Sequence, residues 1–206
     1  MGKQGELRIH AMLTYCEACD HNKDPILQIL KDIFRNSQEV LEIGSGTGQH
    51  AVYFGQHLPH LTWQTSDLLE NHAGIRARLK REGPSNVKFP FLLDVSQHPW
   101  PVVATSAIFS ANTLHIMSWK HVTQLFHGVG EILRPGGIVC IYGPFRYQGK
   151  YTSESNACFD QTLKFRDPHS GLRDFEAINV LACEQGLALV KDYSMPANNQ
   201  TLVWKR

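Results

Sequence analysis

Long apolar runs, an excess of one charge and an even set of cysteines are all missing from this 206-residue sequence. Its longest apolar runs hold only a few residues, whereas a membrane-spanning helix needs about 20. The formal net charge is +1, so no overall field favours nucleic acid or an anionic membrane. Five cysteines, an odd number, indicate reduced thiols rather than a disulfide framework. We therefore expect neither a nucleic-acid partner nor a membrane partner.

The start of the chain also lacks a cationic segment followed by an apolar core, the pattern of a secretory signal. Together with the reduced thiols, this predicts a cytoplasmic protein. Hydrophobic residues make up 42% of the chain and charged residues 19%, which is typical of an ordinary globular domain. The length allows one α/β domain, and nothing in the sequence indicates its oligomeric state.

Hydrophobic periodicity predicts strands that alternate with helices, which indicates a mostly parallel sheet with helices on both faces. The segment "DPILQILKDIFRN" predicts a first helix with Asp24 as its N-cap and Pro25 in its first turn. Further helices are expected over 48–57, 70–82, 118–133 and 173–186. Strands are expected over 39–44, 61–67, 86–95, 105–114, 138–145, 187–193 and 200–205, with "RPGG" at 134–137 as a turn before the fifth.

One stretch departs from this alternation. Residues 146–172 are polar and rich in Tyr, Ser, Asn, Asp and Arg, so we expect an irregular insertion there. The single domain then divides into an N-terminal lid or helix (1–36), a core (37–145), the polar substrate-loop insertion (146–172) and a C-terminal helix with strands (173–206).

The stretch "VLEIGSGTGQH" places three glycines after an apolar strand and before a helix, where a ligand often approaches the backbone. A triphosphate loop is excluded because no Lys-Ser/Thr pair follows the glycines. A dinucleotide loop is disfavoured because Gln49 stands where that motif requires Gly or Ala. Glu42 would also repel a pyrophosphate, whereas it would favour an ammonium group. A glycine-rich turn without any ligand remains an alternative.

The pattern Glu42, Gly44, Gly46, Gly48 resembles motif I of the class I S-adenosylmethionine-dependent methyltransferases. The resemblance continues in order through "TWQTSD", "FLLDV", "FSANTLHIM" and "ILRPGGIVCIYGPF". It implies a Rossmann-like, seven-stranded fold, S-adenosylmethionine as cofactor and S-adenosylhomocysteine as product. The cofactor-binding residues that it implies are Glu42, Gly44, Ser45, Gly46, Gly48, Asp67, Leu68, Asp94, Val95 and Asn112.

Within this set the resemblance gives three carboxylates separate roles. Glu42 would order the cofactor's ammonium group, Asp67 would accept the ribose hydroxyls and Asp94 would lie near the adenine amine. The motifs "NKDPIL", "YGPF", "SNACFD", "GLRDFE" and "PANNQTLVWK" are similar to the methyltransferase group that contains methyltransferase-like protein 26. That group implies no particular substrate.

Methyl transfer would take place beyond the carboxyl ends of the strands. His115 is the candidate general base because a histidine titrates near neutral pH, although a structural role is equally compatible with the sequence. Tyr142 and Tyr151 are candidates for orienting the acceptor, with simple packing as the alternative. The candidate substrate residues are Asn22, Asn156, Asp160, Arg166 and Arg173, although for the arginines a role as solvated surface residues or ion-pair partners is the favoured alternative.

The sequence favours methyl transfer to a small-molecule acceptor, since strand four lacks the [DN]-P-P-[YF] pattern of amino-directed methyltransferases. The alternative is a cofactor-binding sensor or partner subunit without catalysis. Cys16-x-x-Cys19 with His21 has the spacing of metal ligands, but no second ligand pair follows, so we expect no metal.

Overall fold

The computed structural model describes residues 13–206, so the first twelve residues of the predicted N-terminal segment lie outside the described part. The helices are α1 (Glu17–Ile33), α2 (Gln49–His57), α3 (Leu69–Glu82), α4 (Trp119–Ile132), α5 (Glu154–Arg166) and α6 (Phe175–Glu184). The strands are β1 (Glu39–Ile43), β2 (Thr62–Asp67), β3 (Val87–Leu92), β4 (Thr105–Ala111), β5 (Leu133–Gly143), β6 (Phe145–Tyr147), β7 (Lys150–Tyr151), β8 (Arg173–Asp174), β9 (Ala188–Met195) and β10 (Asn199–Lys205). None of these helices combines the length and the hydrophobicity that crossing a bilayer requires.

Seven strands form one sheet in the order β3-β2-β1-β4-β5-β10-β9, which confirms the predicted α/β fold with a mostly parallel sheet. Strands β1 to β5 pair in parallel, and β10 pairs antiparallel with both β5 and β9. The strand order reverses between β1 and β4. In an open α/β sheet, such a switch point opens a crevice at the carboxyl ends of the strands. A second, small sheet has the order β7-β6-β8.

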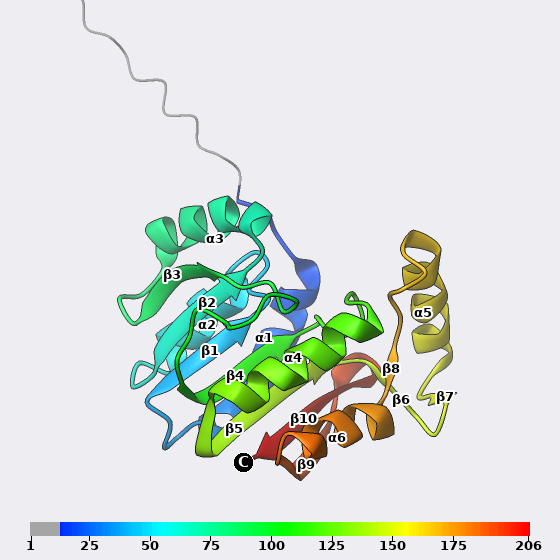
Figure 1. Ribbon diagram of the computed structural model, residues 1–206. Coiled ribbons are helices and arrows are strands. Elements are labelled where there is room, and N and C mark those ends of the chain that lie inside the picture. Colours follow the sequence, from blue (N-terminus) through cyan, green and yellow to red (C-terminus); the bar gives the residue numbers. More distant parts are fainter. Residues whose placement is uncertain (1–12) are drawn as a thin grey trace, which may run out of the picture.

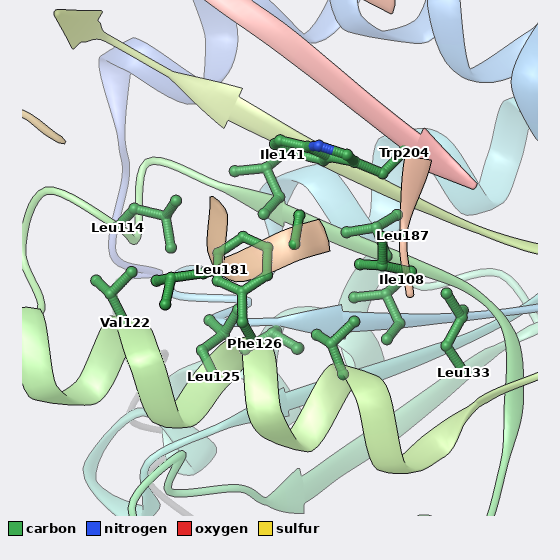
Figure 2. Packing of buried hydrophobic residues seen from close by; sticks show 14 of the residues in the cluster. Ile108, Leu114, Val122, Leu125, Phe126, Leu133, Ile141, Leu181, Leu187 and Trp204 are labelled. Atoms are coloured by element: carbon green, nitrogen blue, oxygen red, sulfur yellow. The ribbon is translucent and has the colours of Figure 1, made fainter. Parts of the chain in front are cut away.

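Helices cover both faces of the large sheet (Figure 1), because successive residues of its strands point to opposite sides and both sides are apolar. Val40 and Phe109 pack with α1 and α2, whereas their neighbours Leu41 and Ile108 pack with α4 and α6. Figure 2 shows the hydrophobic core on the α4 and α6 side of the sheet, where Phe126 of α4 points toward Trp204 of β10. Their rings lie 6.1 Å apart, edge to face.

The first helix begins earlier than predicted. Cys16, rather than Asp24, is the N-cap of α1, and Pro25 lies inside the helix. An internal proline removes one backbone hydrogen bond, so local sequence signals favour a start at Pro25. Contacts with the rest of the protein, described below, hold the extra turns in place.

The segment 146–172 was predicted to be irregular, and this is wrong for its central part. It contains α5, whose N-cap Ser153 accepts a hydrogen bond from the Asn156 N–H. Among its residues, only Asn156, Asp160 and Leu163 are buried. Because this helix has no apolar stripe, hydrophobic periodicity could not reveal it. The "RPGG" turn at 134–137 instead forms a break in the register within β5.

Candidate active site

A cavity of about 930 Å³ opens where the carboxyl ends of the parallel strands meet. The predicted cofactor residues that line it are Gly44, Ser45, Gly46, Asp67, Leu68, Asp94, Val95 and Asn112. They come from the ends of β1, β2 and β4 and from the segment after β3. The fold therefore brings together residues that lie as far apart as Gly44 and Asn112 in the sequence.

The glycine loop between β1 and α2 needs glycine for steric reasons. Gly44, Gly46 and Gly48 have φ values of +75°, +56° and +74°, a region that residues with a side chain rarely adopt. A Cβ on Gly44 would also lie 2.5 Å from Cγ2 of Thr113. A Cβ on Gly46 would meet nothing within 4 Å. The first glycine thus lets the loop pack on the segment after β4, and the second borders the cavity.

Asp67 organises the floor of the cavity. Its Oδ2 accepts a hydrogen bond from the Gly46 N–H (2.6 Å), and its Oδ1 accepts from the Leu68 N–H (2.7 Å) and from Asn71 Nδ2 (2.8 Å). A carboxylate has about four lone-pair sites, so these three donors leave it room to accept one more. Asp67 thereby connects the glycine loop to the end of β2.

Glu42 lies behind the glycine loop, and neither it nor Gly48 is among the residues that line the cavity. Its Oε2 accepts hydrogen bonds from Ser45 Oγ (2.8 Å) and from Trp63 Nε1 (3.1 Å). Burial raises the pKa of this carboxyl to about 7, although both hydrogen bonds favour the charged form. Glu42 therefore reaches the cavity through Ser45, which does line it.

Asp94 and Asn112 form the far side of the floor. Asp94 Oδ1 accepts hydrogen bonds from Ser96 Oγ (2.7 Å) and the Ser96 N–H (2.8 Å), which lower the pKa of the carboxyl. Its Oδ2 has only a long contact with Gln97 Nε2 (3.5 Å) and is thus available as an acceptor. Asn112 adopts a left-handed backbone conformation with φ of 58°, directly after β4.

The charges that line the cavity are mostly negative. Asp67, Glu70, Asp94 and Asp167 are the acidic residues in its wall. Apart from histidines, Lys120 is the basic residue in the described part of the wall. Such a cavity attracts a cationic ligand and repels a polyphosphate.

Residues near the start of α1, within the predicted N-terminal lid or helix, form part of a further wall whose residues were not among the predicted site residues. Cys16 and Cys19 line the cavity together with Thr47 and His50. The Gln49 side chain bonds the Cys16 backbone twice, accepting from its N–H (2.6 Å) and donating to its carbonyl (3.2 Å). Gln49, which argues against a dinucleotide loop, thus attaches the N-terminal helix to α2. Gln49 was noted in the sequence, but its bonding partner Cys16 lies 33 residues away, so the contact could not be predicted.

Arg78 of α3 provides a second attachment. It donates from Nε to the Thr47 carbonyl (2.7 Å) and from Nη2 to the Thr14 carbonyl (2.6 Å). It also forms an ion pair with Glu82 (2.5 Å). The buried guanidinium therefore joins the segment before α1 to the glycine loop.

Asn22 and Tyr142 lie behind this wall and outside the lining of the cavity. Asn22 Oδ1 lies 2.6 Å from Nε2 of His50. Burial raises the pKa of Tyr142 to about 12, and a hydrogen bond with Asn22 opposes this shift. Burial also lowers the pKa of His50 to about 4. These three side chains form a buried polar link between α1, α2 and β5.

His115 is likewise absent from the lining of the cavity. Its ring packs edge to face on Phe159 of α5, with 5.4 Å between ring centroids. Burial, followed by the nearby Arg173 charge, lowers the pKa of His115 to about 4. The structure thus places it between the segment after β4 and α5, as a neutral imidazole at physiological pH.

The candidates in the insertion belong mainly to an internal network. Asp160 accepts hydrogen bonds from Tyr151 Oη, Lys164 Nζ and the Leu172 N–H, each at 2.6 Å. Asn156 Nδ2 donates to Thr152 Oγ1 and to the Asn198 carbonyl, both at 2.9 Å. These contacts fix α5 against the segments on either side of it.

The two candidate arginines lie in different environments. Arg166 is exposed at the end of α5. Arg173 donates from Nε to the Leu114 carbonyl (3.1 Å) and from Nη2 to the carbonyls of Met117 and His169. Arg173 therefore joins the loop after β4 to the loop after α5, and both loops contribute to the cavity wall.

The open side of the cavity was only partly predicted. Its residues are Ile116, Met117, Ser118, Trp119, Lys120, His121, Asp167 and His169. Trp119 and Ile116 remain 41% and 58% exposed there. The sequence placed the acceptor near 112–119 and 143–172, but no local signal separates His121 or His169 from the other histidines.

One group of side chains in residues 13–206 has the spacing of metal ligands. Ligand atoms of His98, His127 and Glu131 lie within 4.8 Å of one another, on the exposed side of α4. None of the three lines the cavity.

Comparison with known proteins agrees with this architecture. A family model described as "Protein of unknown function (DUF938)" matches residues 13–206. An O-methyltransferase family protein from Burkholderia thailandensis is 18% identical and superposes with a TM-score of 0.78, over 89% of this chain and 56% of that one. An O-methyltransferase family 2 protein from Planctomyces limnophilus DSM 3776, solved with apigenin, gives 15% identity and a TM-score of 0.77, over 90% and 57%.

PigF, solved with SAH, is 15% identical, with a TM-score of 0.77 over 88% of this chain and 55% of that chain. This chain thus spans little more than half the length of these structures. At such identities the similarity establishes the fold, which is the Rossmann-like methyltransferase fold.

Proposed function

The chain therefore belongs to the family described as "Protein of unknown function (DUF938)", and we propose that it transfers a methyl group from S-adenosylmethionine to a small-molecule acceptor. One observation carries this proposal: carboxylates and glycines from successive strand ends converge on one acidic cavity at the switch point of the sheet. The similarity to solved methyltransferases supports it.

The negative charge of the cavity favours S-adenosylmethionine over a dinucleotide or a triphosphate. S-adenosylmethionine carries a sulfonium and an ammonium group, and both are favoured near Asp67, Glu70 and Asp94. A dinucleotide or a triphosphate would bring several negative charges to the same walls. Within residues 13–206, the wall offers Lys120 alone, besides histidines, to balance them.

The strand-end residues would hold the cofactor in the roles that the sequence suggests. Asp67 and Asp94 each retain acceptor capacity toward the cavity, for ribose hydroxyls and for the adenine amine. Glu42 would act on the ammonium group through Ser45. When bound, the cofactor supplies an electrophilic methyl group, and the protein must position the acceptor and exclude water.

The acceptor would bind on the open side, against Trp119, Ile116 and Met117. These apolar side chains fit a flat organic molecule better than a polymer. A proton would pass most readily to a histidine that faces this side, and His121 and His169 do so. His115 stays a candidate base, but its lowered pKa makes it a weak one.

The closer relationship to the group of methyltransferase-like protein 26 stays a prediction, as do the cytoplasmic location and the absence of nucleic-acid partners. Tyr142, Tyr151, Asn156 and Asp160 have internal hydrogen-bond partners. We assign them the task of shaping the site rather than touching the acceptor.

Calorimetry with S-adenosylmethionine, S-adenosylhomocysteine and NADH tests the cofactor. We expect both adenosyl compounds to bind and NADH not to bind. Asp94→Asn should weaken binding about tenfold, because one charge-assisted hydrogen bond contributes roughly 1.5 kcal/mol. Asp32→Asn, an exposed carboxylate of α1 outside the cavity, is the matched control. Binding of NADH in place of the adenosyl compounds would overturn the proposal.

Turnover is tested by adding S-adenosylmethionine with a labelled methyl group to a metabolite extract. Label in a small organic product, dependent on intact protein, would support methyl transfer. Cofactor binding without any labelled product would instead favour the alternative, a cofactor-binding sensor or partner subunit.

A further inference from the structure

The Cys16-Glu17-Ala18-Cys19 motif has no part in the proposed methyl transfer, yet its two sulfurs are held together. Cys16 is the N-cap of α1, and its Sγ accepts a hydrogen bond from the Cys19 N–H at 3.4 Å. The Cys16 side chain is also close enough to the Cys19 thiol to contribute to raising its pKa. The pair thus occupies the first turn of a helix, with the Cys16 sulfur bonded to the Cys19 backbone.

The surrounding contacts fix this arrangement. The Gln49 side chain holds the Cys16 backbone on both its N–H and its carbonyl. Both cysteines line the cavity beside the glycine loop. A dissolved oxidant that enters the cavity therefore reaches two neighbouring thiols.

The two thiols differ in their surroundings. Cys16 stands at the N-terminal end of α1, where the helix dipole favours a negative charge. Burial and the contact with Cys16 raise the pKa of the Cys19 thiol. A Cys-x-x-Cys pair at a helix start, with both residues half-buried and lining a cavity, is an arrangement that favours disulfide exchange.

A metal site is a poorer interpretation of the same motif. Structural zinc takes four ligands. In the described residues, the group with suitably close ligand atoms is His98, His127 and Glu131, which includes neither cysteine. The His21 side chain is 72% exposed and lies near Glu17 instead.

We propose that Cys16 and Cys19 form a reversible dithiol–disulfide pair in the wall of the cofactor cavity, oxidised by peroxides. The Cys16 thiolate attacks one peroxide oxygen and becomes a sulfenic acid, while the other oxygen leaves as hydroxide. The Cys19 thiolate then attacks the sulfenic sulfur, forming the S–S bond and releasing a second hydroxide. With the two thiol protons, each peroxide yields two waters, and a dithiol such as reduced thioredoxin reverses the step.

Peroxide oxidation followed by alkylation tests this pair. The intact protein is treated with limiting hydrogen peroxide, its remaining thiols are blocked with N-ethylmaleimide, and its peptides are analysed by mass spectrometry. We expect Cys16 and Cys19 to lose two hydrogens together and to escape alkylation, about tenfold faster than the exposed Cys158 and Cys183 are modified. A dithiol should then restore both thiols.

The controls separate a pair from a single reactive thiol. Cys16→Ser keeps a side-chain acceptor at the N-cap, so α1 should fold. In this variant, peroxide should no longer protect Cys19 rapidly from alkylation. Cys158→Ser combined with Cys183→Ser should leave the rapid phase unchanged. Disulfides between chains, overoxidised Cys16 beside a free Cys19, or oxidation of Cys16 and Cys19 no faster than that of Cys158 and Cys183 would overturn the proposal.

A last arm relates the pair to the cavity. S-adenosylhomocysteine, used as the probe, should slow the oxidation at least about fivefold, because both thiols line the site where it would bind. This arm rests on the proposed function, whereas the first two do not. If the probe fails to bind but the disulfide forms, the redox pair stands and the cofactor assignment fails. If S-adenosylhomocysteine binds but does not slow the oxidation of Cys16 and Cys19, the pair does not lie in the wall of the cofactor cavity, and that part of the proposal is overturned.

Discussion

Gly44 shows how one residue sets the shape of the cofactor loop. Gly44→Ala must adopt a positive φ and place its Cβ at 2.5 Å from Thr113 Cγ2. We expect the free energy of unfolding to fall by about 2–4 kcal/mol, from backbone strain and overpacking together. Gly46→Ala should lower the free energy of unfolding by only about 1–2 kcal/mol, because its Cβ would meet nothing within 4 Å and backbone strain alone remains. Urea unfolding measures both.

A second substitution isolates the steric part. Thr113→Ser removes the methyl group but keeps the hydroxyl that lies 2.6 Å from Ser110 Oγ. In the double variant with Gly44→Ala, about 1–2 kcal/mol should be regained relative to the sum of the two single variants. Strict additivity of the two substitutions would show that this contact does not determine the glycine.

Glu42 predicts a pH dependence of stability with a definite sign. Burial raises the pKa of this carboxyl in the folded protein from 4.5 to about 7, so between these values the folded state keeps a proton that the unfolded state loses. Its stabilising contribution is therefore complete below about pH 4.5 and is lost as the pH rises to about 7. The difference in pKa corresponds to a loss on the order of 3 kcal/mol.

Glu42→Gln tests this without removing the hydrogen bonds, because Ser45 and Trp63 both donate to one carboxyl oxygen. Between about pH 5 and pH 8, the wild-type protein should lose on the order of 3 kcal/mol more than the variant in urea unfolding. Parallel pH profiles for the two proteins would contradict the raised pKa.

Some residues of the site could be predicted and others could not, for a physical reason. Glu42, Gly44 and Gly46 belong to one strand and turn, so their spacing alone carries the information. His121 and His169 line the same cavity because the loop after α5 is bonded to the segment before α4, where the Gly171 N–H donates to the His115 carbonyl. His115 has the same chemistry and a suggestive place in the sequence, but burial beside Phe159 determines its environment.

At the scale of elements, the errors concern segments that tertiary contacts stabilise. Helix α1 begins before Pro25 because Gln49 binds its N-cap residue and Arg78 binds the segment before it. Helix α5 folds around polar contacts at Asp160 rather than around an apolar stripe. The partners that hold α1 are distant in the sequence, and those of Asp160 are near in the sequence but polar, so hydrophobic periodicity reveals neither.

Arg173 should hold two cavity-lining loops together. Arg173→Met leaves the carbonyls of Leu114, Met117 and His169 without this donor, at a local cost of about 1–3 kcal/mol. Hydrogen exchange followed by mass spectrometry should therefore become faster in 113–118 and 167–172, while 40–46 stays unchanged. Arg166→Met, an exposed residue at the end of α5, is the control. Unchanged exchange in both loops would assign Arg173 no such role.

At the scale of the whole molecule, the cavity joins both halves of the fold. The alternation of strands and helices in a mostly parallel sheet was predicted, because buried parallel strands leave a strong apolar pattern, whereas the order of the seven strands comes from the structure alone. The cavity lies at the carboxyl ends of the paired strands β1 and β4, and α1, α4 and the loop after α5 contribute to its sides. A ligand bound there would contact residues from Cys16 to His169, including strand ends on both sides of the switch point, so it should stabilise the protein as one unit.

This gives a prediction for thermal unfolding. S-adenosylhomocysteine at about 100 times its dissociation constant should add roughly 2.7 kcal/mol to the stability of the folded protein. For a chain of this size, that corresponds to a rise of about 5–11 °C in the unfolding temperature. The whole transition should move as a single step, because the ligand touches strand ends on both sides of the switch point. NADH at the same concentration should give no shift, since its pyrophosphate would face Asp67, Glu70 and Asp94. A shift with NADH alone, or a ligand-induced split into two transitions, would contradict a single adenosyl site that joins the two halves of the sheet.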